Sequence, residues 1–178
     1  MNAAAWRVTL AAAALMALIS GGRSAFGLFV SPLNTASGLG LATLSLGLAL
    51  GQLAIGFTQP LVGAVVDRLG AARVIVVAAA LLAVLTTMPA WAPWPALLMV
   101  SLVAGAVAGS AVGSNGLLIG EVNRAVPPER AADAVGIVGA GASVGLLLLG
   151  PLTQWAIDSR GWAWALVATG LLSLVAWP

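Results

Sequence analysis

Long apolar runs are the feature that most limits how this chain can fold. Of its 178 residues, 61% are hydrophobic and only 7% are charged, against roughly 25% charged residues in an ordinary soluble domain. The runs are apolar on every side of a helix, so water cannot be the solvent for their outer surface. We therefore expect an integral membrane protein.

Six such runs follow one another along the chain. Each has about 17 to 24 residues, enough for a helix to cross the hydrocarbon core of a bilayer. Backbone groups in lipid must be paired internally, and the runs lack the alternation typical of barrel strands, so helices are favoured. The predicted fold class is all-α, a bundle of six transmembrane helices. The expected spans are 8–30, 41–63, 74–90, 96–119, 134–154 and 162–178.

Turn-forming residues predict the connections between these spans. None of the connections is long enough for a separate domain, so residues 1–178 are expected to form one membrane unit. The expected turns lie at Ser31-Pro32 with Asn34, and at 67–70, 89–95, 127–128 and 158–161.

The placement of seven arginines, in a chain without lysine, predicts the orientation. Five lie at the start of the chain and in the second and fourth connections, whereas one lies in the fifth connection. Because positive charge is enriched on the cytoplasmic side, both termini are expected in the cytoplasm, with the spans in the inner membrane. The five are Arg7, Arg68, Arg73, Arg124 and Arg130, the one is Arg160, and Arg23 lies within the first span.

Missing residue types exclude several kinds of chemistry. The chain has neither cysteine nor histidine, so disulfides, thiolate or imidazole metal sites, and catalytic pairs of serine or cysteine with histidine are ruled out. We predict no enzyme activity, no cofactor and no metal. The charges are scattered rather than clustered, which argues against nucleic acid as a partner.

The second connection carries a short motif. It reads Gly63-Ala-Val-Val-Asp67-Arg68-Leu-Gly70-Ala-Ala-Arg73. This resembles the signature G-x-x-x-D-R-x-G-x-R-R of the major facilitator superfamily at every position but the tenth, where Ala72 replaces a basic residue. The motif also falls between the second and third spans, the place that the family requires. Without that spacing, the same residues would be interpreted as a solvated basic loop.

The resemblance implies that this connection takes part in conformational coupling. In the family the loop latches the two halves of the transporter together on the cytoplasmic side. The two glycines would allow tight helix ends, and Asp67 would accept backbone N–H groups or lie against a positive helix terminus. We expect the arginines to pair with acids such as Glu121 or with anionic headgroups. The predicted coupling residues are Gly63, Asp67, Arg68, Gly70, Arg73 and Glu121.

Further segments resemble the oxalate/formate antiporter and monocarboxylate-porter branch of this family, and the likeness covers essentially the whole chain. It implies transport of a small organic anion such as a monocarboxylate by alternating access. Two departures make drug/proton antiport less expected. Segment 101–105 lacks the arginine common in proton-coupled relatives, and Gly150-Pro151 lacks the double glycine that should follow. The similar segments are 23–33, 59–63, 124–130, 150–154 and 161–162.

The number of spans indicates which part of the family's fold the chain resembles. Family members have twelve spans in two halves, each an inverted pair of three-helix repeats. This chain ends after six expected spans. We therefore expect an amino-terminal half over 1–178, with one repeat at 8–90 and the other at 96–178. It would be a fragment, a truncated reading frame, or a unit that pairs with a second six-helix half.

Two polar residues within spans are candidates for binding a solute, Arg23 and Asn115. The resemblance implies a solute site near mid-membrane, lined by the first and fourth spans. Arg23 lies about 7 residues, or roughly 10 Å, from the outer end of its expected helix, so it would either attract an anion in a cavity or snorkel to the outer headgroups. Asn115 would bind a carboxylate or form an interhelical hydrogen bond. Gln52 is expected first of all to pack between helices.

Three functions stay open at this stage. The first is secondary active or facilitative transport of a small organic anion, with the lipid bilayer and a second six-helix half as partners. The second is export of drug-like or other metabolites. The third belongs to another class, a non-transporting six-helix remnant or a regulatory subunit that binds another transporter.

Overall fold

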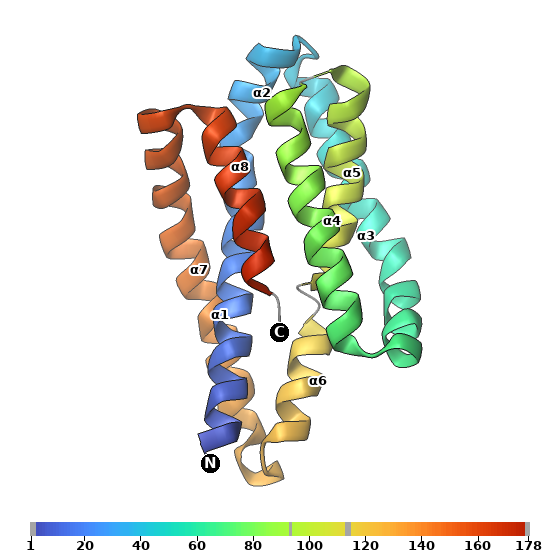
Figure 1. Cartoon of the computed structure of the whole chain (residues 1–178), viewed down its shortest axis with the longest axis vertical. Helices are drawn as coiled ribbons and strands as arrows, with labels where there is room; N and C mark the ends of the chain where they lie inside the picture. The colour runs from blue at the N-terminus through green and yellow to red at the C-terminus, as the bar shows by residue number, and fades with distance from the viewer. Residues whose placement is uncertain (1–2, 93, 113–114, 177–178) are drawn as a thin grey trace.

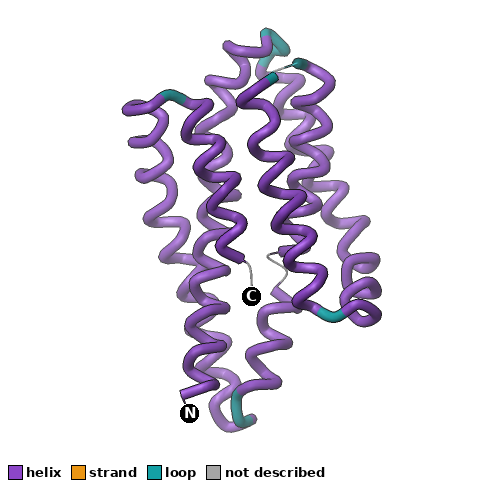
Figure 2. Tube along the Cα trace, in the orientation of Figure 1, coloured by secondary structure: helices purple, strands orange, loops and turns teal. Residues whose placement is uncertain are grey.

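The computed structural model describes residues 3–92, 94–112 and 115–176, and within these ranges every regular element is a helix (Figures 1 and 2). The predicted all-α class is therefore confirmed. The elements in chain order are α1 (Ala3–Ala25), η1 (Phe26–Phe29), α2 (Val30–Ser37), α3 (Leu41–Leu69), α4 (Ala71–Trp91), α5 (Pro95–Val112), α6 (Asn115–Ala125), η2 (Pro128–Arg130), α7 (Ala131–Arg160), α8 (Trp162–Leu172) and η3 (Ser173–Ala176).

Five helical segments in the described ranges are long and apolar enough to cross a membrane. The sixth expected span contains the apolar helix α8, which is shorter than the others, so the six-span arrangement stays a prediction. The five segments are Ala5–Ser37, Leu41–Leu69, Ala71–Trp91, Pro95–Val112 and Pro128–Arg160.

The first predicted turn is wrong. Ser31, Pro32 and Asn34 lie inside α2, and the first segment stays helical to Ser37. Pro32 is the third residue of α2, an early helical position at which a missing N–H is tolerated. The helix instead ends at Gly38, which adopts a left-handed conformation with φ of 67°.

Charged residues that were expected in connections lie in helices. Asp67 and Arg68 belong to the last turn of α3, and Arg124 and Glu121 lie on α6. Asp158 likewise lies within α7. A helix can go on past the edge of the apolar run because its backbone hydrogen bonds do not depend on lipid, and the true connections are consequently shorter than predicted.

Two helix hairpins have matching turns. Gly70 alone joins α3 to α4, and Gly161 alone joins α7 to α8. Their φ angles are 84° and 85°, a conformation that residues with a Cβ rarely adopt. Both turns end the same pattern, P-L-x5-D-x2-G, which begins at Pro60 in α3 and at Pro151 in α7. The sequence interpretation overlooked this internal repeat, and the shared spacing is the signal that would have found it.

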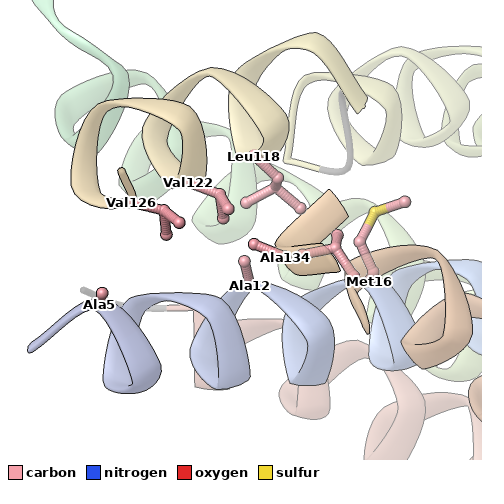
Figure 3. Close-up of a cluster of buried hydrophobic side chains, with 8 residues drawn as sticks. Ala5, Ala12, Met16, Leu118, Val122, Val126 and Ala134 are labelled. Carbon is pink, nitrogen blue, oxygen red and sulfur yellow. The ribbon is translucent and has the colours of Figure 1, made fainter. Parts of the chain in front are cut away.

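The fourth expected span, 96–119, contains α5 and the start of α6. Residues 113–114 between these two helices lie outside the described ranges, so the prediction of a single span is not tested. Helix α5 packs against α3 and α4, whereas α6 packs against α1 and α7. Figure 3 shows Leu118 and Val122 of α6 directed toward Ala12 and Met16 of α1. This stretch of chain therefore contacts both sides of the bundle.

The main contacts pair α1 with α7, α3 with α5, and α4 with both α5 and α8. Figure 1 shows the start of α1, the α3–α4 turn and the α6–α7 connection toward one end of the bundle, and α2 with the α7–α8 turn at the other. Five arginines thus lie in elements at the first end, and Arg160 lies at the second. We call the first the arginine-rich end.

Candidate functional site

Arg23 and Gln52 form a hydrogen-bonded pair between two helices. Arg23 lies in the last turn of α1, and its Nη2 donates to Oε1 of Gln52 in α3. The amide is neutral, so it occupies a guanidinium donor without compensating the positive charge. Within the described part of the chain, the ion pairs are Arg124 with Glu121 and Arg130 with Asp133, on other helices. Arg23 therefore keeps an uncompensated charge.

This pair lines a cavity of about 390 Å³ between the two sides of the bundle. Small-molecule sites commonly have volumes of roughly 300 to 1,000 Å³ with mostly apolar walls, and this cavity fits that description. The Arg23 and Gln52 side chains are exposed, so a molecule entering the cavity can reach them. The polar side chains among its lining residues are Arg23, Ser24, Gln52, Thr86, Ser101, Thr153, Thr169 and Ser173.

Three hydroxyls of the lining donate to backbone carbonyls. Ser101 donates to Leu98 (2.9 Å), Thr169 to Ala165 (2.8 Å), and Ser173 to Gly170 (2.6 Å). Such bonds are the usual way in which serine and threonine are satisfied inside helices. These hydroxyl protons are therefore already engaged.

Thr86 of α4 and Thr153 of α7 differ from that group. Neither hydroxyl makes a hydrogen bond within the described ranges, although both residues line the cavity. Thr153 is 8% exposed as a residue, and its hydroxyl is not among the fully buried atoms without a partner. Both can donate to a solute beside Arg23. Sequence reasoning missed them, and the available signal was a threonine inside an otherwise apolar span.

The helix that carries Arg23 changes its hydrogen-bonding pattern next to the cavity. The 3₁₀ segment η1 begins at Phe26, directly after α1 ends at Ala25, and both Phe26 and Gly27 line the cavity. A second 3₁₀ segment, η3, begins at Ser173, another lining residue. Short 3₁₀ stretches within long helices often mark hinges. The interruption at η1 therefore lies where a bound solute would make contact, and η3, which follows the end of α8, borders the same cavity.

The second residue predicted to bind a solute, Asn115, begins α6. Its side chain lies outside what the structure describes, so that prediction is not tested.

The predicted coupling residues lie around the α3–α4 turn. Gly70 forms the turn itself, as expected, but Gly63 lies within α3 rather than at a helix end. Glu121 pairs with Arg124 at 3.1 Å on its own helix, not with Arg68 or Arg73 as expected. The pair with Arg124 is exposed, so it contributes little to stability. A coupling role for these residues stays a prediction.

A comparison with protein families gives one match. The family model described as Major Facilitator Superfamily matches residues 12–178, nearly the whole chain. No curated protein and no solved structure matched the chain.

Proposed function

Because the chain belongs to the major facilitator superfamily, a family of membrane transporters, we propose that it transports a small organic anion, such as a monocarboxylate, by alternating access. The observation that carries this proposal is the uncompensated guanidinium of Arg23 in a largely apolar cavity. An intramembrane charge is costly unless it has a partner. An anionic solute provides that partner.

Arg23 favours an anion over a neutral solute for two physical reasons. A guanidinium can bind a carboxylate through two parallel charge-assisted hydrogen bonds, which are stronger than the bond to a neutral amide. The surrounding apolar wall lowers the local dielectric and strengthens the attraction further.

Gln52 acts as a positioning residue in this proposal. Its hydrogen bond holds the Arg23 side chain across the space between α1 and α3, which lowers the entropy cost of aligning the guanidinium with a carboxylate. This assignment adds to the expectation that Gln52 holds helices together. It also explains why an amide is suitable here, since a carboxylate at this position would neutralise Arg23.

The proposed architecture is a six-span half made of two inverted three-helix repeats, which works with a second six-helix half. The repeated pattern P-L-x5-D-x2-G supports it, because its two copies end in matching turns at opposite ends of the bundle (Figure 1). The arginine-rich end supports an inner-membrane orientation with both termini in the cytoplasm. We also assign conformational coupling to the turn that contains Asp67, Gly70 and Arg73.

The test is binding of radiolabelled acetate to the purified chain in lipid nanodiscs, with acetamide as a neutral competitor. Acetate should bind and acetamide should not displace it. Arg23→Ala should reduce acetate affinity at least ten-fold, the loss of one charge-assisted interaction of about 1.5 to 3 kcal/mol. Arg23→Lys should reduce it less, because it keeps the charge and loses only the planar fork.

The matched control is Arg124→Ala, which removes an arginine far from the cavity lining. Acetate affinity should be unchanged in this variant. If Arg23→Ala binds acetate as well as the unaltered chain does, Arg23 merely snorkels and the anion proposal fails. Displacement of acetate by acetamide would point instead to a neutral solute.

A further inference from the structure

A second hollow lies on the outer surface of the bundle, away from Arg23. It is a groove of about 1090 Å³ formed by α4 and α5 and closed at one end by the last turns of α3. The part of α4 that lines it extends from Ala72 to Leu85. Arg73 to Leu85 covers about 18 Å at 1.5 Å per residue, close to the roughly 15 Å of one bilayer leaflet. The groove therefore has the depth of a single leaflet.

The shape of this groove comes from the sizes of its side chains. Three alanines, Ala78, Ala108 and Ala111, are buried where α4 meets α5 and form its floor. Larger exposed side chains stand at its edges, including Val77 and Leu81 of α4. Small residues bring two membrane helices close together, and the neighbouring branched side chains leave a hollow above them. Such a hollow accepts a narrow, flexible, apolar chain.

Arg73 supplies the one charge among the groove's lining residues. It lies in the first turn of α4, at the arginine-rich end. Within the described residues it has no ion pair, and the nearby Asp67 makes none with it. A cation at the amino-terminal end of a helix is unfavourable, because that end already carries partial positive charge. An anion beside Arg73 would remove this penalty and would interact with the helix end as well.

We propose that this groove binds one acyl chain of an anionic phospholipid, whose phosphate pairs with Arg73. The apolar wall of the groove suits the acyl chain, and the single charge at one end suits the phosphate headgroup. The length of the groove matches one leaflet of the bilayer. The lining of this lipid site has Leu85 in common with that of the solute cavity, but Arg73 lines only the groove. The lipid site does not depend on which solute is transported.

The test is native mass spectrometry of the full chain, purified from detergent micelles that contain equal amounts of phosphatidylglycerol and phosphatidylcholine. The unaltered chain should retain phosphatidylglycerol in preference. Arg73→Gln should lower that preference about five-fold, the effect expected of one arginine near an anionic membrane surface. Ala104→Phe, which projects a ring into the groove, should lower retention of both lipids.

The matched control is Arg130→Ala, because Arg130 lies at the same end of the bundle but pairs with Asp133. It should leave the preference for phosphatidylglycerol unchanged. Equal retention of the two lipids by the unaltered chain would overturn the proposal. So would an equal loss of the preference for phosphatidylglycerol in Arg73→Gln and Arg130→Ala. Protein dimers that disappear in Ala104→Phe would also overturn it, since the groove would then hold a second copy of the chain. Arg73 is exposed, so its variant should fold even if Ala104→Phe does not.

Discussion

Two helix crossings, α1 with α7 and α3 with α5, are both lined by glycines. They differ in what a methyl group added to those glycines would contact. At the first crossing, a Cβ added to Gly145 would overlap the backbone carbonyl of Ala17, and one added to Gly141 would overlap that of Ala13. At the second, a Cβ on Gly47 would lie 2.9 Å from the Met99 sulfur, at the end of a flexible side chain. At the first crossing the nearest atoms are backbone atoms that the added Cβ would overlap, whereas at the second the nearest atoms belong to side chains and lie 2.9 Å or more away.

The difference bears on the solute cavity. Helix α1 carries Arg23 and is held by the tight crossing, whereas α3 carries Gln52 and is held by the adaptable one. Van der Waals packing of small residues is the main force that joins helices in lipid, so a crossing without freedom to repack should resist motion. We expect the part of α1 that crosses α7 to stay fixed, with motion confined to η1 beyond it, while the Gln52 side of the cavity adjusts.

The largest expected effect comes from Gly145→Ala. The added methyl group would overlap the backbone of α1, which cannot rotate away as a side chain can. The two helices must therefore separate, which should lower the free energy of unfolding by about 3 kcal/mol or more. Unfolding of the purified protein in mixed micelles, titrated with a denaturing detergent, measures this loss.

The matched control for that variant is Gly139→Ala, on the same helix, where an added Cβ has nothing within 4 Å. This change should be neutral or stabilising by up to about 1 kcal/mol, because alanine has the higher helix propensity. Equal destabilisation by Gly145→Ala and Gly139→Ala would show that the α1–α7 crossing is no more sensitive to an added methyl group than the rest of α7.

A smaller effect is expected for Gly51→Ala at the α3–α5 crossing. The new Cβ would lie 3.0 Å from the Ala106 Cβ and 3.3 Å from the Leu102 carbonyl oxygen, so a small shift of α3 relieves the contact. We expect a loss of about 1 kcal/mol, at the low end for overpacking, in the same unfolding titration. A loss as large as that of Gly145→Ala would remove the contrast between the crossings.

The smallest effect is expected for Gly47→Ala. Methionine has three rotatable bonds and fills irregular space, so Met99 can withdraw from the added methyl group. The cost should stay below about 1 kcal/mol. A double-mutant cycle with Met99→Ala sharpens the test, since the two changes should compensate each other. Additive losses would mean that the methyl group is opposed mainly by Leu102, whose Cδ1 would lie 3.0 Å away, and not by Met99.

Sequence reasoning succeeded where composition or backbone sterics decide the outcome. The lack of charge over long runs leaves lipid as the solvent. Helices form there because they pair the backbone N–H and C=O groups within one segment. The turn at Gly70 was expected from its motif, and its positive φ gives the physical reason for the glycine. Helix ends were predicted too early at Asp67 and Asp158, because the end of an apolar run marks the edge of the hydrocarbon and not the end of the helix.

By itself, the sequence determined that this chain is a helical membrane protein of a transporter family, and it singled out Arg23 as a charge that needs a partner. Only the tertiary structure decided which side chain accepts a hydrogen bond from Arg23. Gln52 lies 29 residues away from Arg23 along the chain, on a helix whose rotation and depth depend on how Gly47 and Gly51 pack against α5. Sequence periodicity cannot predict such a contact, because in lipid the apolar sides of a helix are equivalent until a neighbouring helix occupies one of them.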